Sequence, residues 1–316
     1  MNKNIKKIKK VWVPGYKGMV GSAVYKELVS KGYQVVPTTR KELNLFDKKK
    51  ILYFLKKNKP DAVILCAARV GGIFANDNFS GDFIKENLEI QINVIDCCKL
   101  QDTKKLIFLG SSCIYPKFSK QPIKEEYLLT GALEETNQWY AIAKIAGIKM
   151  IQAYRKQFNC NFVSVMPTNL YGPNDNFNKL TSHVIPGMIC KFVEAKVRNK
   201  KKVILWGTGK PKRDFLHVDD LASSIVFILE KYNNDLPINV GSGMDVKIEY
   251  LAKEIAKIVN FKGEIFFDKK FPDGTPRKLL DNSVIKKIGW KPKIKLQSGI
   301  KSTVDWYIKN YNIKKN

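Results

Sequence analysis

The chain has 316 residues, a length that predicts about two domains or one domain with a substantial appendage. Lysine and arginine number 56 against 29 acidic residues, so the formal net charge is +27. Only six of these basic residues are arginine, whereas nucleic-acid readers favour arginine clusters interleaved with aromatic residues. We interpret the charge as a solvated, lysine-biased surface and expect no nucleic-acid partner.

The six cysteines lack the spacing of a metal site or a disulfide framework, so we expect reduced thiols, no bound metal and a cytoplasmic location. The lysine-rich start, residues 1–10, is followed by an apolar run that stops at Pro14. That run is too short for an export signal, and no run of 18 apolar residues follows it. We therefore expect no membrane association.

The chain opens with a predicted strand at residues 10–13, a glycine-rich turn and a helix to about residue 31. The turn reads G-x-x-G-x-x-G, with Gly15 for the tight turn, Gly18 for close approach of a pyrophosphate and Gly21 for helix packing. The helix N-terminus then presents its N–H groups to phosphates. This pattern predicts a dinucleotide site; a purely structural glycine loop is the alternative, because the common fingerprint is G-x-G-x-x-G.

The second predicted strand, residues 34–37, ends where an NAD-specific site offers a carboxylate to the adenosine ribose. This chain offers Arg40, whose guanidinium can pair with a 2′-phosphate in fork geometry. The sequence thus favours NADP(H), with Lys17 assisting. The alternative is that Arg40 is an ordinary surface charge.

Strands and helices then alternate, which predicts an α/β fold with a doubly wound parallel sheet of the Rossmann type. The predicted segments are strands at 62–67 and 105–109 and helices at 48–57 and 81–100. Small residues follow the third strand at Ala67 and Ala68, where a cofactor can lie against the backbone.

The fourth predicted strand ends in Gly110, Ser111, Ser112 and Cys113, so these residues should face the same crevice. Ser111 is placed to hydrogen-bond a substrate oxygen, although paired serines after a strand also form turns.

Tyr140 and Lys144 are four residues apart in a segment of good helix formers, so both side chains lie on one helix face. A lysine cation near a tyrosine lowers the pKa of the phenol from about 10. Such a phenol can protonate a carbonyl oxygen while a hydride reaches the carbon. This pair, together with Ser111, predicts a carbonyl reductase.

These motifs resemble the extended short-chain dehydrogenases that act on nucleotide sugars. More narrowly, several long strings resemble the GDP-L-fucose synthase family across nearly the whole chain. The strings are Ser-Ser-Cys-Ile-Tyr-Pro, Tyr-Ala-Ile-Ala-Lys-Ile-Ala-Gly, Val-Met-Pro-Thr-Asn-Leu-Tyr-Gly-Pro, Ser-His-Val-Ile-Pro, Phe-Leu-His-Val-Asp-Asp and Pro-Asp-Gly-Thr-Pro-Arg-Lys.

The resemblance implies an enzyme that epimerises GDP-4-keto-6-deoxy-D-mannose at C3 and C5 and reduces C4 with NADPH. It implies Cys113 and His183 as the acid/base pair, with ordinary pKa values near 8.5 and 6.5 that straddle neutrality. It also implies a homodimer. The further cofactor contacts that it implies are Met19, Val20, Ser112, Lys144, Pro167, Asn169, Leu170 and His183; the implied substrate contacts are Lys191, Trp206, Arg213 and Asp273.

We predict a cofactor domain at residues 1–170, to which 215–243 return, and a smaller substrate domain at 171–214 and 244–316. His217, the other histidine, precedes a predicted helix, and we interpret it as structural or capping. Lys191 and Trp139 depart from the family pattern close to the sugar. These departures leave open a GDP-4-keto-heptose substrate and C4 reduction without epimerisation. From another class, a non-catalytic NADP(H)-binding protein and, because of the charge, a nucleic-acid binder are the remaining alternatives.

Overall fold

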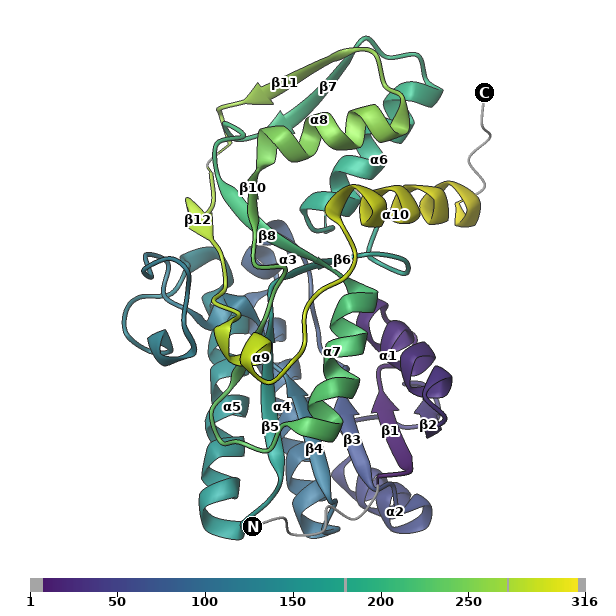
Figure 1. Ribbon diagram of the computed structural model, residues 1–316, viewed down its shortest axis with the longest axis vertical. Helices are drawn as coiled ribbons and strands as arrows, with labels where there is room; N and C mark the ends of the chain where they lie inside the picture. Colours follow the sequence, from purple (N-terminus) through teal and green to yellow (C-terminus); the bar gives the residue numbers. More distant parts are fainter. Residues whose placement is uncertain (1–7, 179–180, 272, 312–316) are drawn as a thin grey trace.

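The computed structural model describes residues 8–178, 181–271 and 273–311, so part of the lysine-rich start, residues 1–7, lies outside the described residues. Its largest sheet is parallel throughout and has the strand order β2-β1-β3-β4-β5-β9 (Figure 1). The strands are β1 (Lys10–Pro14), β2 (Gln34–Thr38), β3 (Ala62–Leu65), β4 (Lys105–Leu109), β5 (Phe162–Pro167) and β9 (Ile238–Val240). The order reverses between β1 and β3, which confirms the predicted doubly wound fold.

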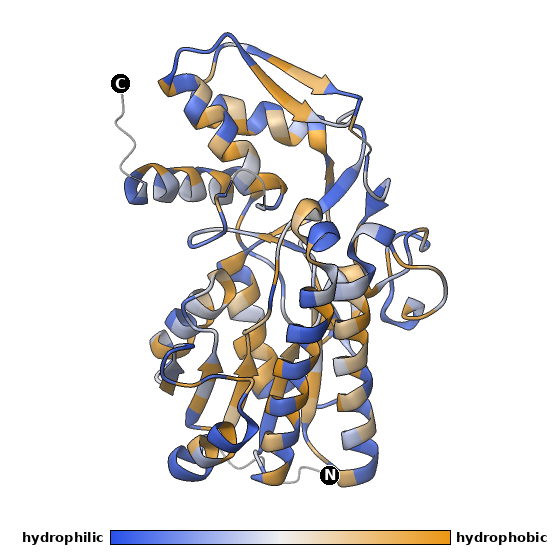
Figure 2. Cartoon of the chain, turned by 180° about the vertical axis from the view of Figure 1, so that it is seen from behind, coloured by the Kyte–Doolittle hydropathy of each residue, from blue (hydrophilic) through white to orange (hydrophobic). Residues whose placement is uncertain are grey.

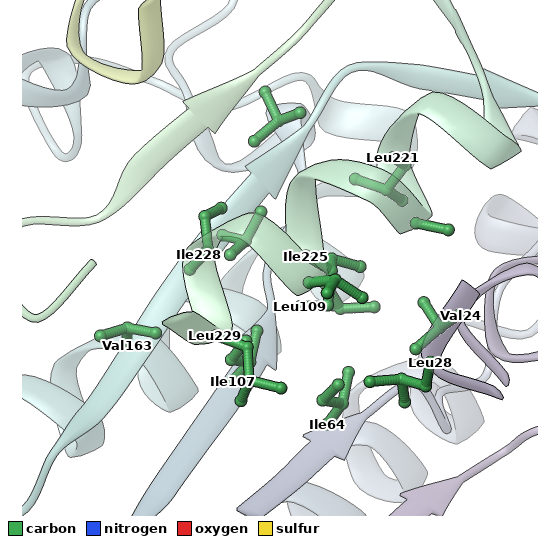
Figure 3. Packing of buried hydrophobic residues seen from close by; sticks show 14 of the residues in the cluster. Val24, Leu28, Ile64, Ile107, Leu109, Val163, Leu221, Ile225, Ile228 and Leu229 are labelled. Atoms are coloured by element: carbon green, nitrogen blue, oxygen red, sulfur yellow. The ribbon is translucent and has the colours of Figure 1, made fainter. Parts of the chain in front are cut away.

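Helices cover both faces of this sheet, because its strands are apolar on both sides. Val11 and Val13 of β1 belong to one buried cluster and Trp12 to the other. One face packs against α1 (Met19–Ser30) and α7 (Val218–Lys231), whose leucine and isoleucine side chains meet Ile64, Ile107 and Leu109 (Figure 3). The other face packs against α2 (Lys48–Asn58), α4 (Ser80–Leu100) and α5 (Gln138–Phe158).

Helix α5 approaches the sheet closely at Gly147. A Cβ atom there would lie 2.6 Å from the ring of Phe108 on β4, so a larger residue would push the helix away. The helix ends at Asn159, which adopts the left-handed conformation with φ of 55°. This close packing brings the helix positions of Tyr140 and Lys144 to the carboxyl end of β4.

The rest of the chain forms a smaller α/β part above the carboxyl ends of the sheet strands (Figure 1). Its short strands, which the sequence did not reveal, form two sheets, one with β8 at its centre and one with β7 and β11 parallel. The strands are β6 (Asn169–Tyr171), β7 (Lys202–Trp206), β8 (Lys212–His217), β10 (Asp245–Lys247), β11 (Glu264–Asp268) and β12 (Arg277–Lys278). Its main helices are α6 (Val184–Val197), α8 (Ile248–Val259) and α10 (Leu296–Asn310), which share a third apolar cluster.

Shorter helices lie in the connections. They are α3 (Ile73–Asn78), α9 (Ser283–Lys287) and the 3-10 helices η1 (Ser112–Ile114), η2 (Glu125–Tyr127) and η3 (Glu135–Asn137). Hydrophobic residues concentrate in the sheet strands and on the inward sides of the helices, and hydrophilic residues on the outer surface (Figure 2). Among the described residues, no helix combines the length and apolar character needed to cross a bilayer.

Candidate active site

A crevice of about 840 Å³ opens where the strand order reverses, at the carboxyl ends of β1 and β3. Open parallel sheets bind their ligands at this position. The predicted cofactor residues that line it are Gly15, Lys17, Gly18, Met19, Val20, Gly21, Arg40, Ala67, Ala68 and His183. A smaller hollow of about 300 Å³ lies at residues 59–61 and 101–104, by the amino ends of β3 and β4 and therefore at the opposite end of the strands from the predicted site.

Two glycines of the turn are required by the geometry of the protein itself. Gly15 has φ of +87°, and a Cβ atom there would lie 2.7 Å from the backbone nitrogen of Ala67. A Cβ atom on Gly21 would lie 2.1 Å from the carbonyl oxygen of Gly15. Gly18 is the N-cap of α1 and makes no side-chain cap, and the first residues of the helix line the crevice with it. This cradle fits the diphosphate of a dinucleotide.

Arg40 lies at the end of the crevice beyond β2. Its side chain is exposed, and its guanidinium carbon is 5.4 Å from the centre of the Phe46 ring. The contact with Phe46 holds the guanidinium beside the crevice while its N–H groups stay available.

Several residues of the crevice were not predicted. Arg69 follows the predicted Ala67 and Ala68, and its guanidinium pairs with Glu86 and, at 3.2 Å, with Asp82. The loop of residues 174–176 also lines the crevice, and the Asn174 side chain donates to the Ser22 hydroxyl of α1 at 3.0 Å. The position of Arg69 directly after Ala68 could have indicated it, whereas the loop of residues 174–176 carries no recognisable sequence pattern.

Lys144 is buried at the carboxyl end of β4. Its Nζ donates to the carbonyl oxygen of Leu109 at 2.8 Å and lies 5.8 Å from the centre of the Tyr140 ring. Burial lowers the pKa of Lys144 to about 8. The ammonium is therefore held behind the phenol, as the four-residue spacing predicted, but it is less basic than an exposed lysine.

The prediction that the pKa of Tyr140 is lowered is wrong for the protein alone. Burial is the largest cause and raises the pKa, and the Cys113 thiol adds to the rise. The nearby Ser111 hydroxyl acts in the opposite direction but is outweighed. The phenol thus carries its proton throughout the physiological range, which is the state needed to protonate a ketone oxygen.

Cys113 lies in the same cluster, in the 3-10 helix after β4. Its backbone N–H donates to the Ser111 hydroxyl at 3.2 Å, and its side chain is partly exposed. The Sγ atom is 3.6 Å from the Asn137 amide nitrogen and 3.9 Å from Lys278 Nζ. Both neighbours were missed, because Lys278 is distant in sequence and Asn137 precedes the quoted helix string.

His183 occupies the N-cap position of α6 and lines the crevice, without a side-chain cap bond. Although its side chain keeps access to the open crevice, the surrounding protein lowers its pKa, so the imidazole is neutral at pH 7. The structure places His183 in the crevice lining, whereas Cys113 lies outside that lining. His217 is buried, and its Nδ1 accepts from the Asp219 N–H at 3.3 Å as a helix cap, which confirms its structural interpretation.

The remaining predicted cofactor contacts lie outside the crevice lining. Gly110 and Ser112 are buried beside β4, and Pro167 ends β5. Asn169 uses its amide internally, donating to the Asp214 carbonyl oxygen at 2.9 Å, while Leu170 packs against the apolar cluster under α7.

The predicted substrate residues gather around the ends of β7 and β8. Lys191 Nζ is 5.4 Å from the Trp206 ring centre and donates to the Ile204 carbonyl oxygen at 3.0 Å. Burial lowers the pKa of Lys191 and, despite nearby carboxylates, that of Arg213. Asp273 accepts from the Thr208 N–H at 2.9 Å and from the Thr208 hydroxyl at 2.6 Å.

Residues 11–241 match a protein family described as the NAD dependent epimerase/dehydratase family, over well more than half of the chain. The chain is a member of the NAD dependent epimerase/dehydratase family. Within that family it is 52% identical to "Probable GDP-L-fucose synthase 1" of Oryza sativa subsp. japonica, over 95% of this chain and 92% of the relative. The predicted resemblance to the GDP-L-fucose synthases is thereby confirmed.

Solved structures of other family members have the same fold. A GDP-mannoheptose C4 reductase from Campylobacter jejuni with NADP bound is 37% identical, with a TM-score of 0.87 over 97% of this chain and 99% of its own. A GDP-L-fucose synthetase from Naegleria fowleri bound to NADP is 29% identical, with a TM-score of 0.88 over 100% of this chain and 98% of its own. The chain is therefore an enzyme of this family and not a non-catalytic NADP(H)-binding protein.

Proposed function

We propose that this chain is an NADP(H)-dependent enzyme that epimerises GDP-4-keto-6-deoxy-D-mannose at C3 and C5 and reduces it at C4, giving GDP-L-fucose. The observation that carries the proposal is the cluster of Ser111, Cys113, Tyr140 and Lys144 at the carboxyl end of β4. A protonated phenol, a hydroxyl, a thiol and an ammonium there serve both steps on one ketone. The relatives named GDP-L-fucose synthase support the choice of sugar.

The glycine cradle, Arg40 and His183 would hold the dinucleotide, since they line one crevice. Among the described residues that line its β2 end there is no carboxylate, and the nearby Glu42 accepts from the Thr39 N–H at 2.7 Å. Bound NADPH supplies a hydride. Tyr140 gives its proton to the C4 oxygen, and Ser111 hydrogen-bonds the same oxygen. Lys144, anchored on the Leu109 carbonyl, stabilises the phenolate that remains.

Epimerisation needs a base on one face of the sugar and an acid on the other, because protons beside a ketone are acidic through the enolate. Cys113 is one of these groups. The Asn137 amide nitrogen and Lys278 Nζ lie against its sulfur, at 3.6 and 3.9 Å. His183 is the other group, and it approaches from α6 in the smaller part of the chain. One of the two takes the proton from the carbon, and the other returns a proton on the opposite face.

The proposal places the nucleotide-sugar in a substrate domain at residues 171–214 and 244–316, with the cofactor domain at 1–170 and 215–243. It also includes a cytoplasmic homodimer formed through α4 and α5. Exposed apolar side chains on these helices, Ile92 and Ile142, support that interface. Light scattering after gel filtration tests the dimer.

A GDP-4-keto-heptose is a second candidate substrate, favoured by the similarity to the heptose C4 reductase and by Trp139, which stands exposed directly before Tyr140. Turnover of GDP-4-keto-6-deoxy-D-mannose with NADPH in deuterated water distinguishes the two, with NMR of the product. Deuterium at C3 and C5 together with NADPH oxidation is expected. Reduction without deuterium would indicate a reductase alone, and turnover of only the keto-heptose would overturn the 6-deoxyhexose.

A further inference from the structure

Two large aromatic side chains stack on the outer face of the sheet formed by β7 and β11. Trp206 ends β7, and Phe271 follows β11 by three residues. Their ring centres are 4.5 Å apart and their planes differ by 14°. Trp206 is 51% exposed and Phe271 40% exposed, so much of each ring faces solvent.

The register of the two strands sets this stack. Asp268 pairs with Trp206, and the Gly207 N–H donates to the Asp268 carbonyl oxygen at 3.0 Å. The same carbonyl accepts from the Phe271 N–H at 3.4 Å, so the chain turns back over the tryptophan. Asp273, bonded to Thr208, ties the loop of Phe271 to the loop after Trp206.

Two cations lie near the stack or its loop. Lys191 Nζ lies 5.4 Å from the Trp206 ring centre. A Cβ atom on Gly274 would lie 3.3 Å from a terminal nitrogen of Arg213, so the guanidinium lies close to the chain three residues after Phe271. Aromatic faces flanked by cations fit an aromatic base that carries phosphates.

We propose that Phe271, together with Trp206, forms a two-walled site for the purine base of the GDP-sugar, with the base inserted between the rings. The inference rests on the proposed function, since it assigns the base of that substrate. Without substrate the rings cover each other and hide apolar surface from water. With the base between them they separate to roughly 7 Å, twice the contact distance between carbon atoms.

The net gain on binding is the difference between two ring–base contacts and the one ring–ring contact that they replace. Phe271→Ala removes one wall, and we expect it to weaken GDP binding by about tenfold, as for loss of one stacked base contact. Phe271→Tyr keeps the ring and should bind GDP as tightly as the unmodified chain. Because only the base is affected, the preference for GDP over UDP should shrink in Phe271→Ala.

The test is calorimetric titration of each full-length variant with GDP, UDP and inorganic pyrophosphate, after matching of melting temperatures. Phe266→Ala is the control, because Phe266 is 42% exposed on the same sheet but is covered by Lys202 Nζ at 4.0 Å. GDP binding should be unchanged in the control, and pyrophosphate binding unchanged in all variants. Unaltered GDP affinity in Phe271→Ala overturns the inference, as does an equal loss of GDP and pyrophosphate affinity.

Different results would refute the proposed function and this inference. If the unmodified chain binds neither GDP nor GDP-L-fucose, both proposals are overturned. If it binds both and Phe271→Ala binds them equally well, only the aromatic site is overturned.

Discussion

Replacement of Arg40 by alanine tests how the chain selects its cofactor. The guanidinium lies beside the crevice and contacts Phe46. Of the described lining residues at that end none is a carboxylate, and the adjacent Glu42 is engaged by the Thr39 N–H. A charge-assisted hydrogen bond to a phosphate contributes about 1.5–3 kcal/mol. Because Arg40 is exposed to solvent, screening places its contribution at the lower end. About 1.4 kcal/mol corresponds to a tenfold change in affinity.

We therefore expect Arg40→Ala to raise the Kd for NADPH by about tenfold and to leave the Kd for NADH unchanged. The NADPH affinity of Arg40→Lys should lie between those of Arg40→Ala and the unmodified chain, because an ammonium keeps the charge but cannot form two parallel hydrogen bonds to a phosphate. The assay is a fluorescence titration of each reduced cofactor at fixed ionic strength. Lys41→Ala is the matched control, since Lys41 is an exposed neighbour outside the crevice lining.

Two results would refute the argument. If Arg40→Ala weakened the binding of NADPH and NADH equally, Arg40 would support the crevice as a whole and would not bind the 2′-phosphate specifically. Unchanged affinity for both would mean that Arg40 is a surface charge, which was the alternative at the sequence level.

Further predictions concern the reacting groups and the glycine turn. Tyr140→Phe should abolish NADPH oxidation, and Cys113→Ala should abolish deuterium wash-in while some NADPH is still oxidised; equal loss of both steps in each variant would contradict this division. Reduction should slow as the pH rises through about 8, because Lys144 then loses its proton while Tyr140 retains its own, and a rate that is constant from pH 7 to 9.5 would contradict it. Gly21→Ala should lower both the melting temperature and NADPH affinity, because its Cβ atom would meet a carbonyl oxygen at 2.1 Å, whereas Gly81→Ala, with open space around it, should change neither.

The parallel sheet was predictable because its strands are apolar on both faces and are separated by helices of regular length. The glycine turn was also predictable, since Gly15 and Gly21 stand where no Cβ atom fits. The short strands of the smaller part were not, because three-residue strands such as β6 and β10 carry no periodicity. Their pairing depends on contacts between segments far apart in the chain.

Within the site, the grouping of Ser111, Tyr140 and Lys144 followed from spacing, but the direction of the pKa shift of Tyr140 did not. Spacing shows that a cation is near, whereas the pKa also depends on how much water the fold removes, and here burial outweighs the other causes. The neighbours of Cys113 could not be predicted from the sequence either, because they are brought to it by the fold. Lys278 arrives from β12, whose position is set by its pairing with β8.

The placement of β12 links the two parts of the chain at the reacting thiol. Lys278 of β12 pairs with Arg213 of β8, so one strand pair holds both the cation beside Cys113 and a guanidinium predicted to contact the substrate. A change that weakens the β8–β12 pairing would therefore disturb the Lys278–Cys113 contact and the position of Arg213 together. The surroundings of the reacting thiol and a residue proposed to contact the substrate thus depend on one pair of strands.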